Sequence, residues 1–165
     1  MNIHALSENY GIRKLKEEDI PLILDVCLGN PQFYLYTQAK PEEENIRYDM
    51  QALPPGKQIQ DKYYIGFFKE DRLYAIMDLI GGYPDEQTAF IGFFMMHAQY
   101  SGKGLGSELI REVCSALKKE GFAKIRLCIN DGNPQSFHFW TKNGFVPLKK
   151  VQRDDGTVIL AEKVL

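Results

Sequence analysis

Hydrophobic residues along this chain of 165 residues follow strand-like periods in some segments and helix-like periods in others. Apolar runs of strand length at Tyr63–Phe68, Leu73–Ile80 and Ala89–Met96 are separated by polar connections, so we predict three consecutive antiparallel strands. Apolar residues then recur every three or four positions from Leu105 onward. This pattern predicts an amphipathic helix that ends at Gly121.

The remaining elements follow from the same patterns and from turn signals. We predict further strands at Tyr10–Leu15, Ala123–Ile129, Phe145–Lys150 and Val158–Val164, and further helices at Lys16–Leu28, Pro41–Ala52 and Pro134–Asn143. The last two strands would close the chain as a hairpin, and the strand at Ala123–Ile129 would be buried. A mixed, mainly antiparallel sheet with helices gives an α+β class, in a single domain over residues 1–165.

Composition narrows the class of protein. The hydrophobic fraction is 44% and the formal net charge is -2, so no basic surplus points to nucleic acid or to an anionic membrane. Met1–Glu8 lacks the blocks of a signal peptide, and no apolar run is long enough to cross a bilayer. The three cysteines have no metal-like spacing, so free thiols in a reducing compartment are expected. We therefore expect a cytoplasmic protein with no nucleic-acid partner, no membrane partner and no metal site.

A glycine-rich segment lies between the apolar run at Ala89–Met96 and the amphipathic helix. It places Gly102, Gly104 and Gly106 at every second position. A strand, a glycine-rich turn and a helix in this order direct several backbone N–H groups and the positive end of the helix dipole at one point. Glycine lets a bulky anion approach these donors, and a diphosphate is the natural occupant.

The glycine-rich segment could be one of several types of phosphate-binding loop, or a turn that binds no ligand. A Walker-type loop needs lysine directly after its last glycine, but Gly106 is followed by Ser107 and Lys103 lies inside the turn. A dinucleotide fingerprint needs Gly-x-Gly-x-x-Gly and an acidic residue about 20 positions on, whereas this chain has Gly-x-Gly-x-Gly, with Asp131 after the next predicted strand. A tight turn without any ligand also remains open at this point.

Two motifs together resemble one family. Ser101–Gly106 resembles the acyl-CoA loop Arg/Gln-x-x-Gly-x-Gly/Ala of the GNAT superfamily of N-acetyltransferases, with Ser101 where the family usually has arginine or glutamine. Asn133–Pro147 resembles the family's C-terminal motif, in which Asn133 caps a helix that Pro134 begins. Both motifs in this order and at this spacing extend the resemblance over nearly the whole chain.

The resemblance implies a three-layer fold, a donor and a set of contacts. The central sheet would have parallel fourth and fifth strands that splay apart, with acetyl-CoA wedged between them and its pantetheine arm paired to the fourth strand. The residues implied as contacts of coenzyme A are Phe94, Met95 and Met96 through their main chain, Ser101, Gly102, Lys103, Gly104, Leu105, Gly106 and Ser107 in the loop, and Asn133, Ser136, Phe139 and Trp140. For Trp140, core packing is the alternative role.

The catalytic groups usual in the family are missing from their positions. Trp140 replaces the tyrosine that protonates the thiolate in many members, and an indole is not a general acid. Cys128 either protonates the leaving thiolate or is a buried, inert thiol, and the second role is favoured. Asp78 interrupts an apolar strand, so it either orients a cationic amine and takes its proton or faces outward. His97 either transfers a proton or caps a turn.

Aromatic residues complete the candidate site. Tyr34, Tyr36 and Tyr83 either contact the acceptor ammonium by cation–π interaction or form the core of a lid. We hypothesise an acetyl-CoA-dependent N-acetyltransferase that works by direct attack of an amine in a ternary complex. A non-catalytic acyl-CoA binder or sensor and a nucleotide-binding module for NAD or ATP are the alternatives. The acceptor would be a small-molecule or peptide amine, and a homodimer is an assembly that the family resemblance implies.

Overall fold

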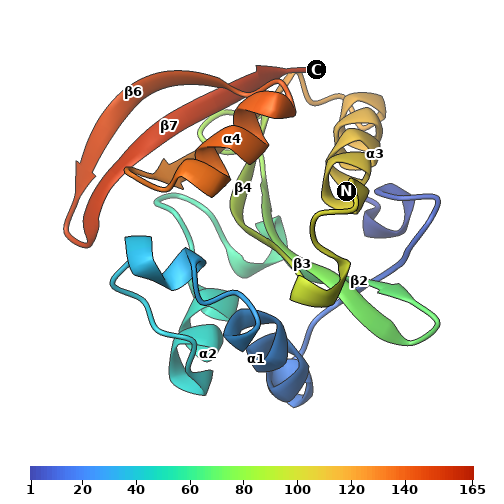
Figure 1. The fold of residues 1–165 in the computed structure, drawn as a ribbon. Coiled ribbons are helices and arrows are strands. Elements are labelled where there is room, and N and C mark those ends of the chain that lie inside the picture. Colours follow the sequence, from blue (N-terminus) through green and yellow to red (C-terminus); the bar gives the residue numbers. More distant parts are fainter.

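Seven strands form one mixed sheet in the computed structural model, which describes all residues of the chain, 1–165 (Figure 1). The strands are β1 (Gly11–Lys14), β2 (Lys62–Lys69), β3 (Arg72–Gly81), β4 (Thr88–Met96), β5 (Lys124–Asn130), β6 (Val146–Arg153) and β7 (Gly156–Val164). The α-helices are α1 (Ile20–Leu28), α2 (Glu43–Gln51), α3 (Leu105–Lys119) and α4 (Pro134–Lys142). The short 3-10 helices are η1 (Ile3–Ala5), η2 (Glu17–Asp19), η3 (Phe33–Tyr36), η4 (Ile59–Asp61) and η5 (Ala98–Tyr100).

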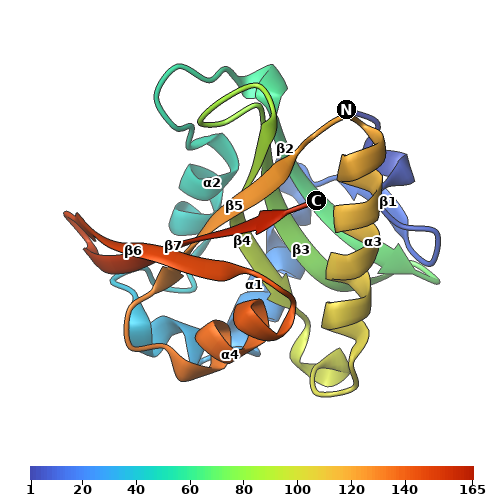
Figure 2. The ribbon, with the colours of Figure 1, turned by 90° about the horizontal axis from the view of Figure 1, so that it is seen from above.

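The sheet changes character between β4 and β5. The strand order is β1-β2-β3-β4-β5-β7-β6, and every neighbouring pair is antiparallel except the parallel pair β4–β5, which α3 connects. The parallel register runs only from Thr88 with Lys124 to Ile91 with Leu127, although β4 continues to Met96 (Figure 2). The α+β class with parallel, splayed fourth and fifth strands is therefore confirmed.

Helices cover both faces of the sheet and give three layers (Figures 1 and 2). The face under α3 and α4 carries the larger apolar cluster, and α1 and α2 cover the other face. The amphipathic pattern of α3 is confirmed, because one face of the helix is fully buried at Leu109, Ile110, Val113 and Leu117. None of the helices combines the length and the apolar character needed to cross a bilayer.

The strand expected to be buried along its whole length is buried only at every second residue. In β5, Ile125, Leu127 and Ile129 lie in the larger cluster, while Arg126 and Cys128 alternate with them and are partly exposed. The reason is that only one face of β5 meets the packed core. On its other face, Cys128 and Asn130 border a cavity, and Arg126 pairs with Glu162 of β7.

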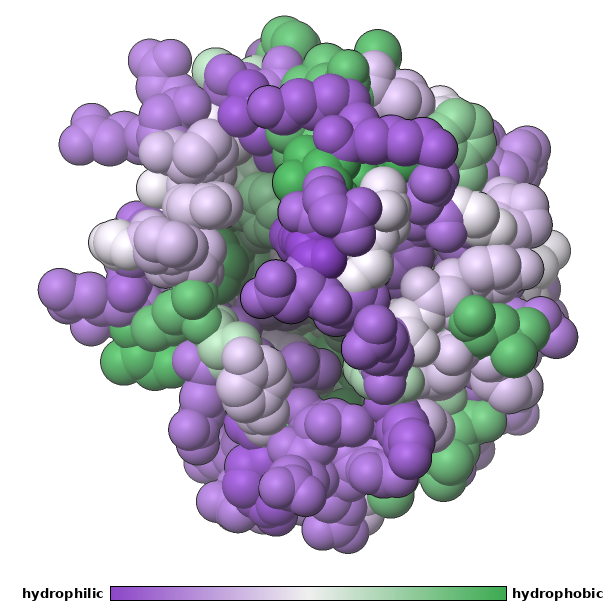
Figure 3. Space-filling model, turned by 90° about the vertical axis from the view of Figure 1, so that its left-hand side faces the viewer, coloured by the Kyte–Doolittle hydropathy of each residue, from purple (hydrophilic) through white to green (hydrophobic).

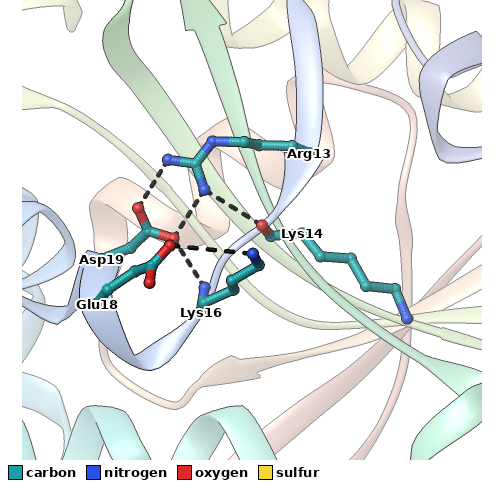
Figure 4. A network of polar contacts seen from close by, with 5 residues as sticks. All are labelled: Arg13, Lys14, Lys16, Glu18 and Asp19. Carbon is teal, nitrogen blue, oxygen red and sulfur yellow. Dashed lines mark hydrogen bonds and ion pairs between the residues drawn. The ribbon is translucent and has the colours of Figure 1, made fainter.

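The predicted helix over Lys16–Leu28 consists of two elements, η2 and α1. The Asp19 carboxylate accepts the backbone N–H of Lys16 at 2.8 Å and closes the 3-10 turn before α1 begins. The same carboxylate accepts two N–H groups of the Arg13 guanidinium, each at 2.7 Å (Figure 4). The Asp19 side chain is only 7% exposed, so this bidentate pair fixes β1 to the start of α1.

Asp19→Asn is expected to lower the free energy of unfolding by about 1–2 kcal/mol at pH 7, because it removes a charge-assisted bond whose Arg13 partner is half exposed. The Arg13 guanidinium holds the pKa of Asp19 below its usual range. The carboxylate therefore stabilises the fold fully above about pH 5 and loses this effect as the pH falls through its folded-state pKa. Urea denaturation of both proteins at pH 7 and pH 3 measures the difference. A difference of equal size at both pH values would contradict this account.

Candidate active site

A cavity of about 790 Å³ opens where β4 and β5 part. It is walled by β4 from Phe90 to Met96, by the glycine-rich loop before α3, by α4, and by the segment around η3. Residues of α2, β2 and β3 line it as well. Viewed from the side of the β6–β7 hairpin, apolar surface lies at the bottom of hollows bordered by hydrophilic residues (Figure 3). The cavity thus joins the cofactor loop to the interior of the sheet.

The glycines of the loop are required for two different reasons. Gly102 and Gly104 have φ values of 75° and 81°, which favour glycine, and a Cβ on either would point into open space. Gly106 lies against the Met96 and Phe139 side chains, each 3.3 Å from where its Cβ would be. The first two positions therefore set the loop conformation, and the third allows α3 to approach β4 and α4.

The N-terminus of α3 presents free backbone donors at this loop. The first helical bond runs from the N–H of Glu108 to the carbonyl of Gly104 at 3.1 Å, so the N–H groups of Leu105, Gly106 and Ser107 precede the helical ladder. The positive end of the helix dipole adds to them. Gly102, Gly104, Gly106 and Ser107 all line the cavity, and an anion that enters there meets this set of donors.

Most of the predicted coenzyme A contacts lie together along this cavity. Its lining includes Phe94, Met95, Met96, Ser101, Gly102, Gly104, Gly106, Ser107, Asn133, Ser136, Phe139 and Trp140. The structure does not bring Lys103 and Leu105 into the lining, and the Nζ of Lys103 instead donates to the carbonyl of Gln99 at 3.2 Å. Asn133 caps α4 as predicted, accepting the N–H of Ser136 at 2.9 Å.

Ser101 lines the cavity at the start of the loop. Gln99 lies in η5, immediately before the loop, and does not line the cavity.

Trp140 packs in the core and also lines the cavity. Its side chain is 6% exposed, and its ring lies 5.0 Å from those of Phe139 and Phe145 and 5.9 Å from that of Phe94. Core packing, the alternative role for this residue, therefore accounts for its burial. The indole packs between α4 and Phe94 of β4.

Asp78 faces inward, so the outward-facing interpretation of this residue is wrong. Its Oδ2 accepts a bond from the Nζ of Lys62 at 2.7 Å, and the two side chains are 13% and 1% exposed. No protein group donates to Oδ1, which is fully buried. Burial raises the pKa of Asp78, and the Lys62 ammonium acts against this rise.

Gly92 makes room for the Asp78 carboxylate. The β3–β4 register shifts here, because Asp78 pairs with Phe93 and Leu79 with Ile91, and Gly92 is left between the paired residues. A Cβ on Gly92 would lie 2.6 Å from Oδ2 of Asp78. Gly92 is also the first residue after the β4–β5 pairing ends, so the carboxylate sits where the two strands part.

Sequence reasoning missed Lys62, Asp49 and Tyr64, which share this end of the cavity with Asp78. Asp49 and Tyr64 line it, and the Nζ of Lys62 lies 5.7 Å from the centre of the Tyr64 ring. The surrounding protein and the negative charge of Asp78 raise the pKa of Asp49 to about 6, although its side chain is open to the cavity. A lysine at the start of an apolar strand was the one local signal available.

His97 lies outside the lining of the cavity. Its Nδ1 accepts the N–H of Gln99 at 3.2 Å, and its Nε2 lies 3.2 Å from Oδ2 of Asp25. These contacts correspond to the turn-capping alternative, and the proton-transfer role has no geometric support.

The predicted aromatic contacts of the acceptor separate in the structure. Tyr34 lines the cavity beside Phe33, whose ring packs 5.6 Å from that of Phe93. Tyr36 lines a smaller adjoining hollow of about 470 Å³, and Tyr83 packs against Phe90 outside the lining. Cys128 lines the cavity, and burial raises the pKa of its thiol.

Residues 30–145 match the model of the acetyltransferase (GNAT) family. The chain belongs to this family. GNAT proteins use acetyl-CoA as their donor, and the solved structures of two similar proteins contain coenzyme A. The mixed sheet with parallel, splayed β4 and β5 is thus the fold of this family.

Two similar proteins resemble this GNAT chain at low overall identity. A spermidine N(1)-acetyltransferase of Thermoplasma acidophilum is 35% identical over 65 residues, a match that spans 39% of this chain and 38% of that protein. An acetyltransferase from Thermus thermophilus has the same fold, with a TM-score of 0.75 at 20% identity over 95% of this chain and 97% of that one.

Two further solved structures share the fold and contain coenzyme A. The PaiA N-acetyltransferase of Thermoplasma acidophilum gives a TM-score of 0.67 at 23% identity over 94% of this chain and 99% of that one. RimL, a ribosomal L7/L12 alpha-N-protein acetyltransferase, gives a TM-score of 0.71 at 15% identity over 97% of this chain and 96% of that one.

Gly92→Ala is expected to lower the free energy of unfolding by about 1–3 kcal/mol, because its Cβ displaces a carboxylate that is bonded to a buried lysine. Gly11→Ala is the matched control, since Gly11 is also a strand glycine and its Cβ would meet only the carbonyl of Phe68, at 3.8 Å. Equilibrium urea unfolding of both variants and the parent measures the effect. Equal stabilities of the two variants would rule out the close approach of Gly92 and Asp78.

Proposed function

We propose that this chain is an acetyl-CoA-dependent N-acetyltransferase that moves the acetyl group to a primary amine by direct attack in a ternary complex. The observation that carries this proposal is the single cavity that extends from the glycine loop to the Asp78 carboxylate. Because one space reaches both ends, donor and acceptor can be bound at the same time. Such proximity alone supplies a large part of the rate of a bimolecular reaction.

The residues present fit the donor. The cradle at Gly102 and Gly104 suits a pyrophosphate, because it combines free N–H groups with space that any side chain would fill. The edge of β4 from Phe93 to Met96 has no strand partner on the β5 side, so it can receive an extended amide-containing arm as an added strand. Phe139 and Trp140 would form the apolar wall beside this arm.

Asp78 is the group we propose for the acceptor side. An amine reaches a protein near neutral pH as an ammonium ion and must lose a proton before its nitrogen can attack the thioester. Acetyl-CoA supplies the activated acyl group. Asp78 lines the cavity at the parting of β4 and β5, which suits its carboxylate to hold the ammonium and to take that proton.

The acceptor we propose is a small amine that is cationic in water. Two carboxylates, Asp49 and Asp78, face this end of the cavity, and the aromatic ring of Tyr34 lies in the same wall. The relative named for spermidine acts, by that name, on an amine of this kind. A cytoplasmic location fits a chain whose three cysteines are free thiols.

A non-catalytic acyl-CoA sensor is the second candidate, and Trp140 favours it because it stands where many family members have the acidic tyrosine. Release of free coenzyme A thiol from acetyl-CoA, measured over a panel of mono-, di- and polyamines and a peptide N-terminus, decides between the two. Turnover with one amine class supports the transferase. Saturable binding of acetyl-CoA without any thiol release supports the sensor.

Gly104→Val is expected to weaken coenzyme A binding by about tenfold or more, because a branched side chain would occupy the space in front of the α3 donors. Gly121→Val is the matched control. Gly121 lies at the other end of the same helix, has a φ of 96° and also faces open space, so valine strains the backbone there in a comparable way. Isothermal titration with coenzyme A and thermal unfolding of both variants separate the two effects.

Both valine variants should lose a similar stability of about 1–2 kcal/mol from the left-handed backbone. Only Gly104→Val should also lose affinity. If Gly104→Val binds coenzyme A as tightly as Gly121→Val does, the loop is not the pyrophosphate site.

A further inference from the structure

The ion pair of Lys62 and Asp78 is buried at the wall of a solvent-accessible cavity. Lys62 is 1% exposed, and its Nζ contacts Oδ2 of Asp78 at 2.7 Å. The Tyr64 ring lies close to the same ammonium. Removing two charges from water costs more than a single pair usually returns, so a buried pair contributes little to stability. Its place in this fold therefore calls for a role other than holding the sheet together.

The two carboxylate oxygens of Asp78 differ in their hydrogen-bond partners. Oδ2 is held by Lys62 on one side and by Gly92, which leaves no space for a Cβ, on the other. Oδ1 receives no bond from any protein group, although it is buried. A buried carboxylate oxygen without a donor costs free energy, so this carboxylate is held in place at the expense of stability.

We propose that Lys62 is a positioning residue for acetyl transfer: it is the counter-ion that holds the Asp78 carboxylate at the wall of the cavity, where this carboxylate binds the acceptor ammonium and takes its proton. This inference rests on the proposed function and extends it from Asp78 to the groups that control Asp78. Asp49 is the second such group: the charge of Asp78 raises the pKa of Asp49, and because repulsion between two carboxylates is mutual, an ionised Asp49 opposes the ionisation of Asp78.

The proton balance of the reaction is complete with these groups. The Asp78 carboxylate takes one proton from the ammonium, and the neutral nitrogen then forms a bond to the carbonyl carbon of the thioester. When the carbon–sulfur bond breaks, the electron pair leaves with sulfur. The second proton lost by the nitrogen goes to this thiolate, and the first leaves Asp78 for the solvent. No oxidant or reductant is required.

The charges that surround Asp78 determine how its proton affinity responds to substitution. The ionisable groups at this end of the cavity are Lys62 and Tyr64 from β2, Asp49 from α2, Cys27 from α1 and Tyr34 from η3. Burial raises the pKa values of the Cys27 thiol and of both tyrosines, so these three stay neutral near pH 7. Lys62 and Asp49 are then the charges that act on Asp78, and they act in opposite directions.

Substitution of Lys62 tests the proposal. In Lys62→Met, the pKa of Asp78 rises because its burial is no longer offset by a neighbouring ammonium. The acid limb of the kcat/KM profile against pH is therefore expected to move upward by about one pH unit or more. The profile is recorded with the same acceptor for every protein, so the titration of the acceptor itself is common to all of them.

Asp49→Asn gives the opposite expectation. It removes the carboxylate whose ionisation competes with that of Asp78, since the repulsion between the two charges is mutual, so the acid limb is expected to move downward. Glu44→Gln is the matched control, because Glu44 lies on the same helix, is exposed and does not line the cavity. It should leave the acid limb within about 0.2 pH units of the parent.

Lys62→Gln is a second variant, to be used if Lys62→Met does not fold. Glutamine removes the charge of Lys62 but keeps a hydrogen-bond donor for Oδ2 of Asp78. Thermal unfolding and coenzyme A affinity are measured for each variant. Opposite shifts in the Lys62 and Asp49 variants support the proposal. Unmoved acid limbs in folded, active variants overturn it, and so does a shift of the same sign in both. A parent protein that binds acetyl-CoA and acetylates no amine contradicts the proposed function instead.

Discussion

The structure depends on the short parallel pairing of β4 and β5. Four residue pairs join these strands, from Thr88 with Lys124 to Ile91 with Leu127, and the strands then diverge. Divergence leaves backbone groups on the inner edge of β4 without a strand partner and opens the space that the glycine loop and α4 border. The main cavity of the protein is therefore a consequence of interrupted hydrogen bonding in the sheet.

The second constraint is charge at the inner end of that cavity. Asp78 and Lys62 come from adjacent strands, and the shifted register around Gly92 gives the carboxylate its space. The bulge and Gly92 thus leave space for the Asp78 carboxylate, and the buried Lys62 forms an ion pair with it. Since each of these features costs stability when taken alone, their coincidence beside the cavity is best understood through chemistry and not through folding.

Local patterns predicted the fold, the turn at the glycine loop and the cap of α4. The conformations of Gly102 and Gly104, the cap at Asn133 and the buried face of α3 depend on residues close in sequence, and such features can be read from spacing. The burial of β5 was overestimated, because an apolar run does not reveal that one face of the strand borders a cavity.

The acceptor side could be predicted only in part. Asp78 was recognisable because it interrupts an apolar strand, but its partners are contributed by other elements. Asp49 lies on a helix rich in polar residues, and Lys62 begins a strand, so neither has a local pattern that separates it from an ordinary surface residue. His97 has a suitable place in the sequence, yet its ring turns to Asp25 and to the backbone of Gln99.

The break in the sheet has a mechanical consequence. Strands β1 to β4 on one side and β5 to β7 on the other are each bonded along most of their length, so the sheet consists of two stiff halves joined by a narrow strip. A ligand that binds along β4 and touches α4 would connect the halves where the protein's own hydrogen bonds do not. Binding of such a ligand would therefore add resistance to unfolding beyond that of the apolar core, which is shared by both halves under α3 and α4.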